Sequence, residues 1–152
     1  MPVEHTWYLT EDLEDFLARA GEFLRSRPAL HTMPLTVSDS LRTGGPHVHG
    51  VWNPLYGVLG EEAEGVAVLV HAPLQPLHVT PLAQGEAEEL ADCLLARGHC
   101  VPAVMATRDT AAAFTTAWER TASGVIGILR VRHRLYRLGE LTVPGPVPEG
   151  RE

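Results

Sequence analysis

Residues 65–98 read GVAVLVHAPLQPLHVTPLAQGEAEELADCLLARG, a stretch that predicts two strands followed directly by a helix. Residues 66–71 are almost continuously apolar, which is typical of a strand covered on both faces. Residues 77–82 resume an extended pattern, and Pro81 ends it because proline can neither continue a central strand nor lie inside a helix. Apolar residues then recur at helical spacing, so we expect a helix over residues 84–97.

The flanking regions predict further strands and helices. A helix is expected over residues 10–26, with Thr10 as its N-cap and an Asp15–Arg19 pair one turn apart. Residues 30–42 also have helical spacing, but Pro34 lies among them, so we expect two short helical pieces with Pro34 opening the second. Residues 43–54 have the composition of a loop, and a strand over 55–59 completes an antiparallel meander with the two strands above.

The carboxyl half predicts one more strand and helix before the chain extends. Residues 101–105 form a short apolar run typical of a buried strand. Asp109 or Thr110 is expected to cap a helix that carries Phe114 and Trp118 as an i,i+4 aromatic pair. Finally, the sequence predicts one long strand over 125–138 and a linker or tail over 143–152, which is rich in proline and glycine.

Composition and charge exclude several classes of function. The chain has 152 residues, of which 45% are hydrophobic, and its net charge is −7. An acidic chain of this kind does not favour nucleic-acid or membrane partners, since both prefer an excess of base. Two cysteines do not make a disulfide framework, and neither a signal peptide nor a membrane-spanning run is visible, so we expect a cytoplasmic protein.

The predicted order of elements resembles the GNAT family of N-acetyltransferases. Four stretches are similar to the N-terminal region of two-domain actinobacterial members: TWYLT at 6–10, RPALHT at 27–32, the helix at 109–120, and RLYRLG at 134–139. The resemblance implies an α/β (α+β) sandwich in residues 1–142, with a twisted, mostly antiparallel mixed sheet and about four helices. It also implies that a catalytic domain follows the linker.

Members of this family bind acetyl-CoA with a loop of the pattern Gln/Arg-x-x-Gly-x-Gly/Ala, whose small residues let backbone N–H groups approach the phosphates. The corresponding junction here, residues 80–87, reads TPLAQGEA and has one glycine at a different spacing. Pro81 lacks an N–H donor, and Glu86, Glu88 and Glu89 add negative charge where a phosphate would lie. We therefore expect no cofactor bound by this chain and assign no catalytic or cofactor-binding residue.

Histidine and cysteine offer weak metal or redox hypotheses. His47 and His49 share a Gly/Pro-rich loop, but neither a carboxylate nor a cysteine lies near them in sequence, so a solvated pair is favoured over zinc. His71 and His78 lie on adjacent predicted strands, where they either face each other or simply complete the sheet. For the group Cys93, His99 and Cys100 we prefer a half-buried helix thiol and a thiol at a strand entry. No metal site is assigned.

A row of cations stands out in the acidic chain. On the predicted strand over 125–138, one face would carry Arg130, Arg132, Arg134 and Tyr136. Three interpretations remain open: a solvated face balanced by acidic helices, a docking surface for a second domain or another subunit, or an anion site for a phosphate-bearing ligand.

The resemblance implies a non-catalytic N-terminal domain that supports a C-terminal acyl-CoA-dependent N-acetyltransferase domain. Its partner would be that domain or another subunit of a homo-oligomer. Two alternatives stay open: a stand-alone acetyltransferase with an atypical cofactor loop, and a small-ligand binding module that uses the cleft between the meander and the strand at 101–105.

Overall fold

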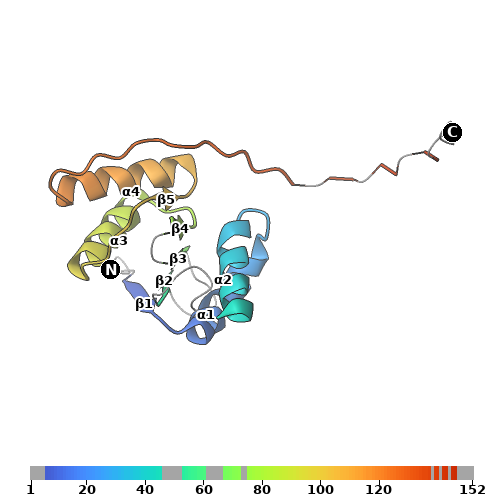
Figure 1. Ribbon diagram of the computed structural model, residues 1–152, viewed down its shortest axis with the longest axis horizontal. Coiled ribbons are helices and arrows are strands. Elements are labelled where there is room, and N and C mark those ends of the chain that lie inside the picture. The colour runs from blue at the N-terminus through green and yellow to red at the C-terminus, as the bar shows by residue number, and fades with distance from the viewer. Residues whose placement is uncertain are drawn as a thin grey trace, which may run out of the picture.

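A computed structural model describes residues 6–45, 53–60, 67–72 and 75–137, together with 139–140, 142–143 and 145–146. These residues form a mixed α/β fold with five strands and four helices (Figure 1). In chain order the elements are β1 (Trp7–Thr10), α1 (Leu13–Ser26), α2 (Thr32–Gly44), β2 (Leu55–Leu59), β3 (Ala67–His71), β4 (Leu77–Val79), α3 (Gln84–Ala96), β5 (Val104–Met105) and α4 (Arg108–Thr121).

The strands form one sheet in the order β1-β2-β3-β4-β5. The first four strands are antiparallel neighbours, and their register pairs Tyr8 with Val58 and Val70 with His78. β5 pairs with β4 in parallel, aligning Leu77 with Val104, because helix α3 carries the chain back to the end at which β4 began. The expected antiparallel meander is therefore confirmed, and the sheet is mixed.

Helices cover both faces of the sheet (Figure 1). On one face, α3 and α4 pack against inward side chains of the strands, and on the other face α1 and α2 do the same. β2 and β3 are buried along their whole length, as expected for central strands that are covered on both sides. The first core contains Leu59, Leu69, Leu77, Leu90, Leu94 and Phe114, and the second contains Phe16, Leu24, Leu41, Tyr56, Val58 and Val70.

The organising stretch folds as its sequence predicts. β3 and β4 form the hairpin, and Pro81 follows β4 directly. Helix α3 begins at Gln84 and ends at Ala96, one residue short of the expected end. Gly98 has φ +66°, a left-handed conformation that glycine adopts without a steric penalty and that commonly ends a helix.

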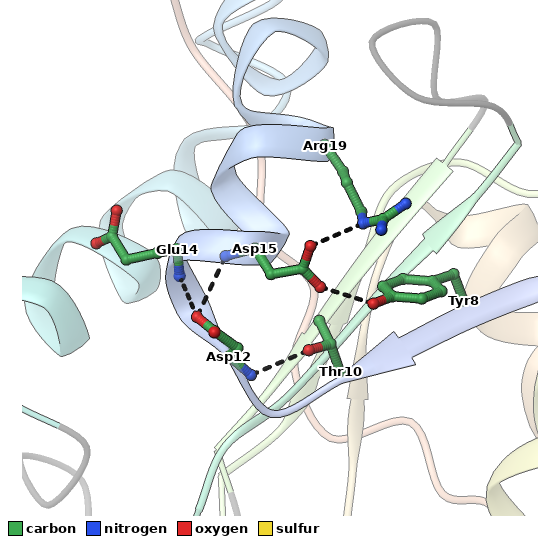
Figure 2. A network of polar contacts seen from close by, with 6 residues as sticks. All are labelled: Tyr8, Thr10, Asp12, Glu14, Asp15 and Arg19. Atoms are coloured by element: carbon green, nitrogen blue, oxygen red, sulfur yellow. Dashed lines mark hydrogen bonds and ion pairs between the residues drawn. The ribbon is translucent and has the colours of Figure 1, made fainter.

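The corner between β1 and α1 differs from the prediction at its cap (Figure 2). Asp12, not Thr10, is the N-cap: its Oδ1 accepts hydrogen bonds from the N–H groups of Glu14 at 2.9 Å and Asp15 at 3.2 Å. Thr10 instead accepts the Asp12 N–H, at 3.1 Å. The predicted Asp15–Arg19 ion pair is present at 2.9 Å.

Pro34 does not divide the second helical region, so the prediction of two short pieces was wrong. Helix α2 runs continuously over Thr32–Gly44. Pro34 is its third residue, inside the first turn, where backbone N–H groups have no partner within the helix. A proline there removes no helical hydrogen bond, and its fixed φ suits the helix.

The strand predicted over 125–138 was also wrong as far as the described residues show. Residues 122–137 pass back along α4 and then leave the body of the protein (Figure 1). None of these residues pairs with the sheet, and all but Ala122 are exposed. The cause is that a strand needs a neighbour for its N–H and C=O groups, and this segment lies beside a helix.

Candidate functional site

The carboxyl ends of β4 and β5 form the edge at which α3 and α4 begin. In open α/β sheets, ligands commonly bind outside this end of the parallel strands. Helix N-termini there present backbone N–H groups and partial positive charge. This edge, which we name the β4–β5 corner, is defined by residues 80–86 and 106–110.

Thr110 ties the two halves of the β4–β5 corner together. Its side chain is 1% exposed, and its Oγ1 accepts the Leu82 N–H at 2.9 Å. The Thr107 hydroxyl donates to the same oxygen, at 3.1 Å. The prediction that Asp109 or Thr110 caps α4 was wrong, because the helix begins at Arg108 after Thr107 and the Thr110 hydroxyl is used across the corner.

A carboxylate lies at the N-terminus of α3. The Ala83 N–H donates to Glu86 Oε2 at 2.8 Å, which places negative charge beside the positive end of the helix dipole. The Glu86 carbonyl in turn accepts the Trp7 indole N–H at 3.3 Å, which connects this turn to β1. The charge that would attract an anionic ligand is thus already compensated by the protein's own side chain.

A cavity of about 310 Å³ lies beside the corner, between the end of α1, the α1–α2 connection and Pro81. His31 lines it and is 2% exposed. The His31 Nδ1–H donates to the Leu24 carbonyl at 3.0 Å, so in the neutral form of the ring Nε2 is an acceptor. Its ring packs on Phe23, with centroids 4.9 Å apart. With Arg27 as the cation of the lining, this cavity can accept a hydrogen bond and attract an anionic group.

A second cavity of about 310 Å³ lies at the opposite end of the sheet. Its lining includes Glu11, Asp12, Asn53 and the 2% exposed Tyr56. Burial raises the pKa of Tyr56 to about 12, so its hydroxyl stays protonated at neutral pH. The two cavities therefore differ in charge: one is bordered by an arginine and a histidine, and the other by carboxylates.

His71 pairs with His99, a contact that neither of the two interpretations of His71 and His78 included. The His71 Nε2–H donates to the Gln75 carbonyl at 3.1 Å, so its Nδ1 is an acceptor and receives the His99 Nε2–H at 2.5 Å. His78 lies across from Val70 in the sheet register. The donors are assigned in this order because the Gln75 carbonyl can only accept a hydrogen bond, so His71 Nε2 must carry the proton.

Both rings of this pair are neutral at pH 7. Burial, followed by the charge of His99, lowers the pKa of His71 to about 4. Burial also lowers the pKa of His99, and the nearby Arg97 adds to that effect. Among the described residues, no group of three His, Cys, Asp or Glu side chains is arranged to hold a metal ion.

Of the other residues singled out in the sequence, those that the structure describes do not converge on either cavity. His47 and His49 lie outside the described residues. Cys93 is half-buried on α3 and Cys100 is exposed before β5, both as free thiols. The row of Arg130, Arg132, Arg134 and Tyr136 lies in the exposed segment after α4. None of the described helices is long and apolar enough to cross a membrane.

Sequence reasoning missed the chemistry of His31 and Thr110. Both are buried polar residues whose partners are set by tertiary contacts, and no motif marks either one. Comparison of the chain with protein-family models, with curated proteins and with solved structures found no match.

Proposed function

We propose that residues 1–142 are a non-catalytic, GNAT-like domain that supports a C-terminal acyl-CoA-dependent N-acetyltransferase domain in the cytoplasm. The order of elements supports this proposal. The elements from β1 to α4 follow the order on which the resemblance rests, while the final strand of that order is missing from the described residues.

The observation that carries the non-catalytic part is the position of Glu86. In the family, the helix after the central strand receives the pyrophosphate of acetyl-CoA at its N-terminus. Here the Glu86 carboxylate accepts the Ala83 N–H at that place, and Pro81 provides no N–H. A phosphate would have to displace a carboxylate from its hydrogen bond and would then lie beside a like charge.

Calorimetric titration of the chain with acetyl-CoA tests this proposal. We expect no measurable binding and no acetyl transfer to amine acceptors by this chain alone. Tight binding of acetyl-CoA would overturn the non-catalytic assignment and favour the stand-alone enzyme.

A matched pair of variants tests the role of Glu86 itself. Glu86→Ala removes the carboxylate from the α3 N-terminus and frees the Ala83 N–H, so its affinity for inorganic pyrophosphate is expected to rise by up to about tenfold. Glu89→Ala changes the net charge equally but lies at an exposed position further along α3. Equal pyrophosphate affinities in the two variants would contradict the proposal that the Glu86 carboxylate itself blocks anion binding at the α3 N-terminus.

The supporting role has its own test. We expect the coding sequence after residue 152 to specify an acetyltransferase domain, and amine acetylation by that domain to fall when residues 1–142 are deleted. Full activity of the isolated second domain would argue against a supporting role.

The His31 cavity favours a second candidate function, the binding of a small ligand. An acceptor nitrogen on a nearly buried ring and a neighbouring Arg27 suit a ligand that has both a donor group and an anionic group. A thermal-shift screen with nucleotides and amino acids tests it. A ligand that raises the midpoint of the wild type but not of His31→Phe would support this candidate, and the absence of any hit would count against it.

A further inference from the structure

The segment over residues 125–137, which we name the arm, carries large apolar side chains with no cover. Ile126, Ile128, Leu129, Val131 and Leu135 are 60–81% exposed. Apolar groups gathered in this way on one segment are typical of an interaction site. The arm's one hydrogen bond to the body among the described residues joins the Gly127 N–H to Glu119. The rest of the arm leaves the body (Figure 1).

The second half of the arm has the pattern of a half-buried strand. Leu129, Val131 and Leu135 would share one face with His133, and Arg130, Arg132, Arg134 and Tyr136 would lie on the other. A mainly apolar face opposite a mainly charged one predicts a strand with one face on a core and one in water. In a segment that stays in water, this apolar face would remain exposed without any compensating contact.

The arm also has the opposite charge to the body. Residues 122–137 contain four arginines and no acidic residue, whereas residues 1–121 contain seven arginines and sixteen carboxylates. None of the four arginines of the arm forms an ion pair within the described part of the chain. The complement to this basic segment is therefore the acidic body of the same protein.

The body offers a place for a strand at β5. Among the described strands, β5 lies at the end of the sheet and pairs with β4 only. The core beside it is incompletely covered, because Val101, Val104, Ala106 and Trp118 are only partly buried. An open sheet edge with partly covered apolar residues is a template for pairing with another strand.

We propose that the arm of one copy adds as a strand to the β5 edge of a second copy, and that the exchange is reciprocal. The arm is about 43 Å long when extended, enough to reach a neighbouring molecule. In its own chain it runs back along α4 and then leaves the body without pairing with the sheet (Figure 1). Reciprocal exchange closes a two-fold dimer and puts each basic arm against an acidic body. This inference goes beyond the proposed function and does not depend on it.

Sedimentation velocity of the full chain tests the proposal. We expect a dimer at about 100 μM protein that dissociates on dilution and more readily at high salt, since the arm's arginines contribute. Hydrogen exchange should show protection of the amides over residues 129–136 in the dimer, because an unpaired segment exchanges at the rate of an unfolded chain.

Two proline variants separate strand pairing from general adhesion. Val131→Pro removes an N–H from the middle of the proposed strand and should weaken dimerisation by about tenfold or more. Val143→Pro is the control, since it changes another exposed valine of the carboxyl-terminal segment outside the arm and should dimerise like the wild type. Both positions lie outside the folded core, so circular dichroism and the unfolding midpoint should be unchanged.

Three results would overturn the proposal: a monomer throughout the concentration series, equal dimerisation of Val131→Pro and the wild type, or a dimer whose arm amides exchange as in an unfolded chain. A failure here leaves the acetyl-CoA titration unaffected, and acetyl-CoA binding would leave the dimer unaffected. The two proposals can therefore fail separately.

Discussion

Replacing Thr110 by valine is expected to destabilise the fold through one backbone group, the Leu82 N–H. Valine has nearly the size and the same β-branched shape as threonine, so packing and helix propensity change little. The loss is the oxygen that accepts the Leu82 N–H at 2.9 Å. A buried donor left without an acceptor costs about 1–3 kcal/mol. Because Leu82 is only half-buried, we expect about 1–2 kcal/mol.

Urea unfolding followed by tryptophan fluorescence measures this cost, since Trp7 and Trp118 both contact the core beside α3 and α4. The urea midpoint should fall without a change in the slope, because the surface exposed on unfolding is the same. In thermal unfolding the corresponding decrease is about 2–8 °C for a chain of this size.

Two further substitutions control the experiment. Thr116→Val makes the same change at an exposed position of the same helix and should stay within about 0.5 kcal/mol of the wild type. Thr110→Ser keeps the hydroxyl and should recover much of the loss. If Thr110→Val were as stable as Thr116→Val, the Leu82 N–H would be satisfied by water and Thr110 would not tie the β4–β5 corner.

Three further predictions concern His71, Gly57 and Tyr8. The folded chain holds the pKa of His71 at about 4, below the ordinary 6.5, so the free energy of unfolding should be full above pH 6.5 and fall by about 3 kcal/mol as the pH approaches 4. Urea midpoints across this range measure the loss, and His71→Leu should flatten it. Gly57→Ala would place a Cβ 2.8 Å from Leu69 side-chain carbons and should cost about 1–3 kcal/mol in urea unfolding. An unchanged midpoint would contradict that tight contact. Tyr8→Phe should bring the pKa of Asp15 back up toward its ordinary value in an NMR titration, because the Tyr8 hydroxyl is the largest cause of its lowering.

The parts of the fold that the sequence predicts well are those set by local pattern. Continuous apolar residues predict β3, and helical spacing predicts α3, because both signals come from burial along a single element. The errors occur where two local options compete. Thr10 and Asp12 are both good N-caps two residues apart. The effect of Pro34 depends on where α2 begins, and the α1–α2 connection sets that point.

The candidate sites are less predictable because their partners are distant in sequence. His71 and His99 are 28 residues apart, as are Leu82 and Thr110. Such pairs form only once α3 has brought β5 alongside β4, and no spacing rule describes that step. From the sequence, His71 was expected either to face His78 or to complete the sheet, and neither interpretation included its contact with His99.

The arm also shows that a local sequence pattern does not identify the partner of a strand. Its alternating residues 129–136 satisfy the requirements for a strand that can be read from one segment. A strand also needs a neighbouring backbone to pair with, and the sequence of the segment itself does not show whether one is present. An apolar face would be costly to keep in water, while the β5 edge is equally incomplete. Strand exchange between two copies accounts for both the exposed apolar face of the arm and the open β5 edge. The hydrogen-exchange experiment on the arm therefore decides whether the predicted strand was absent or only lacked its partner.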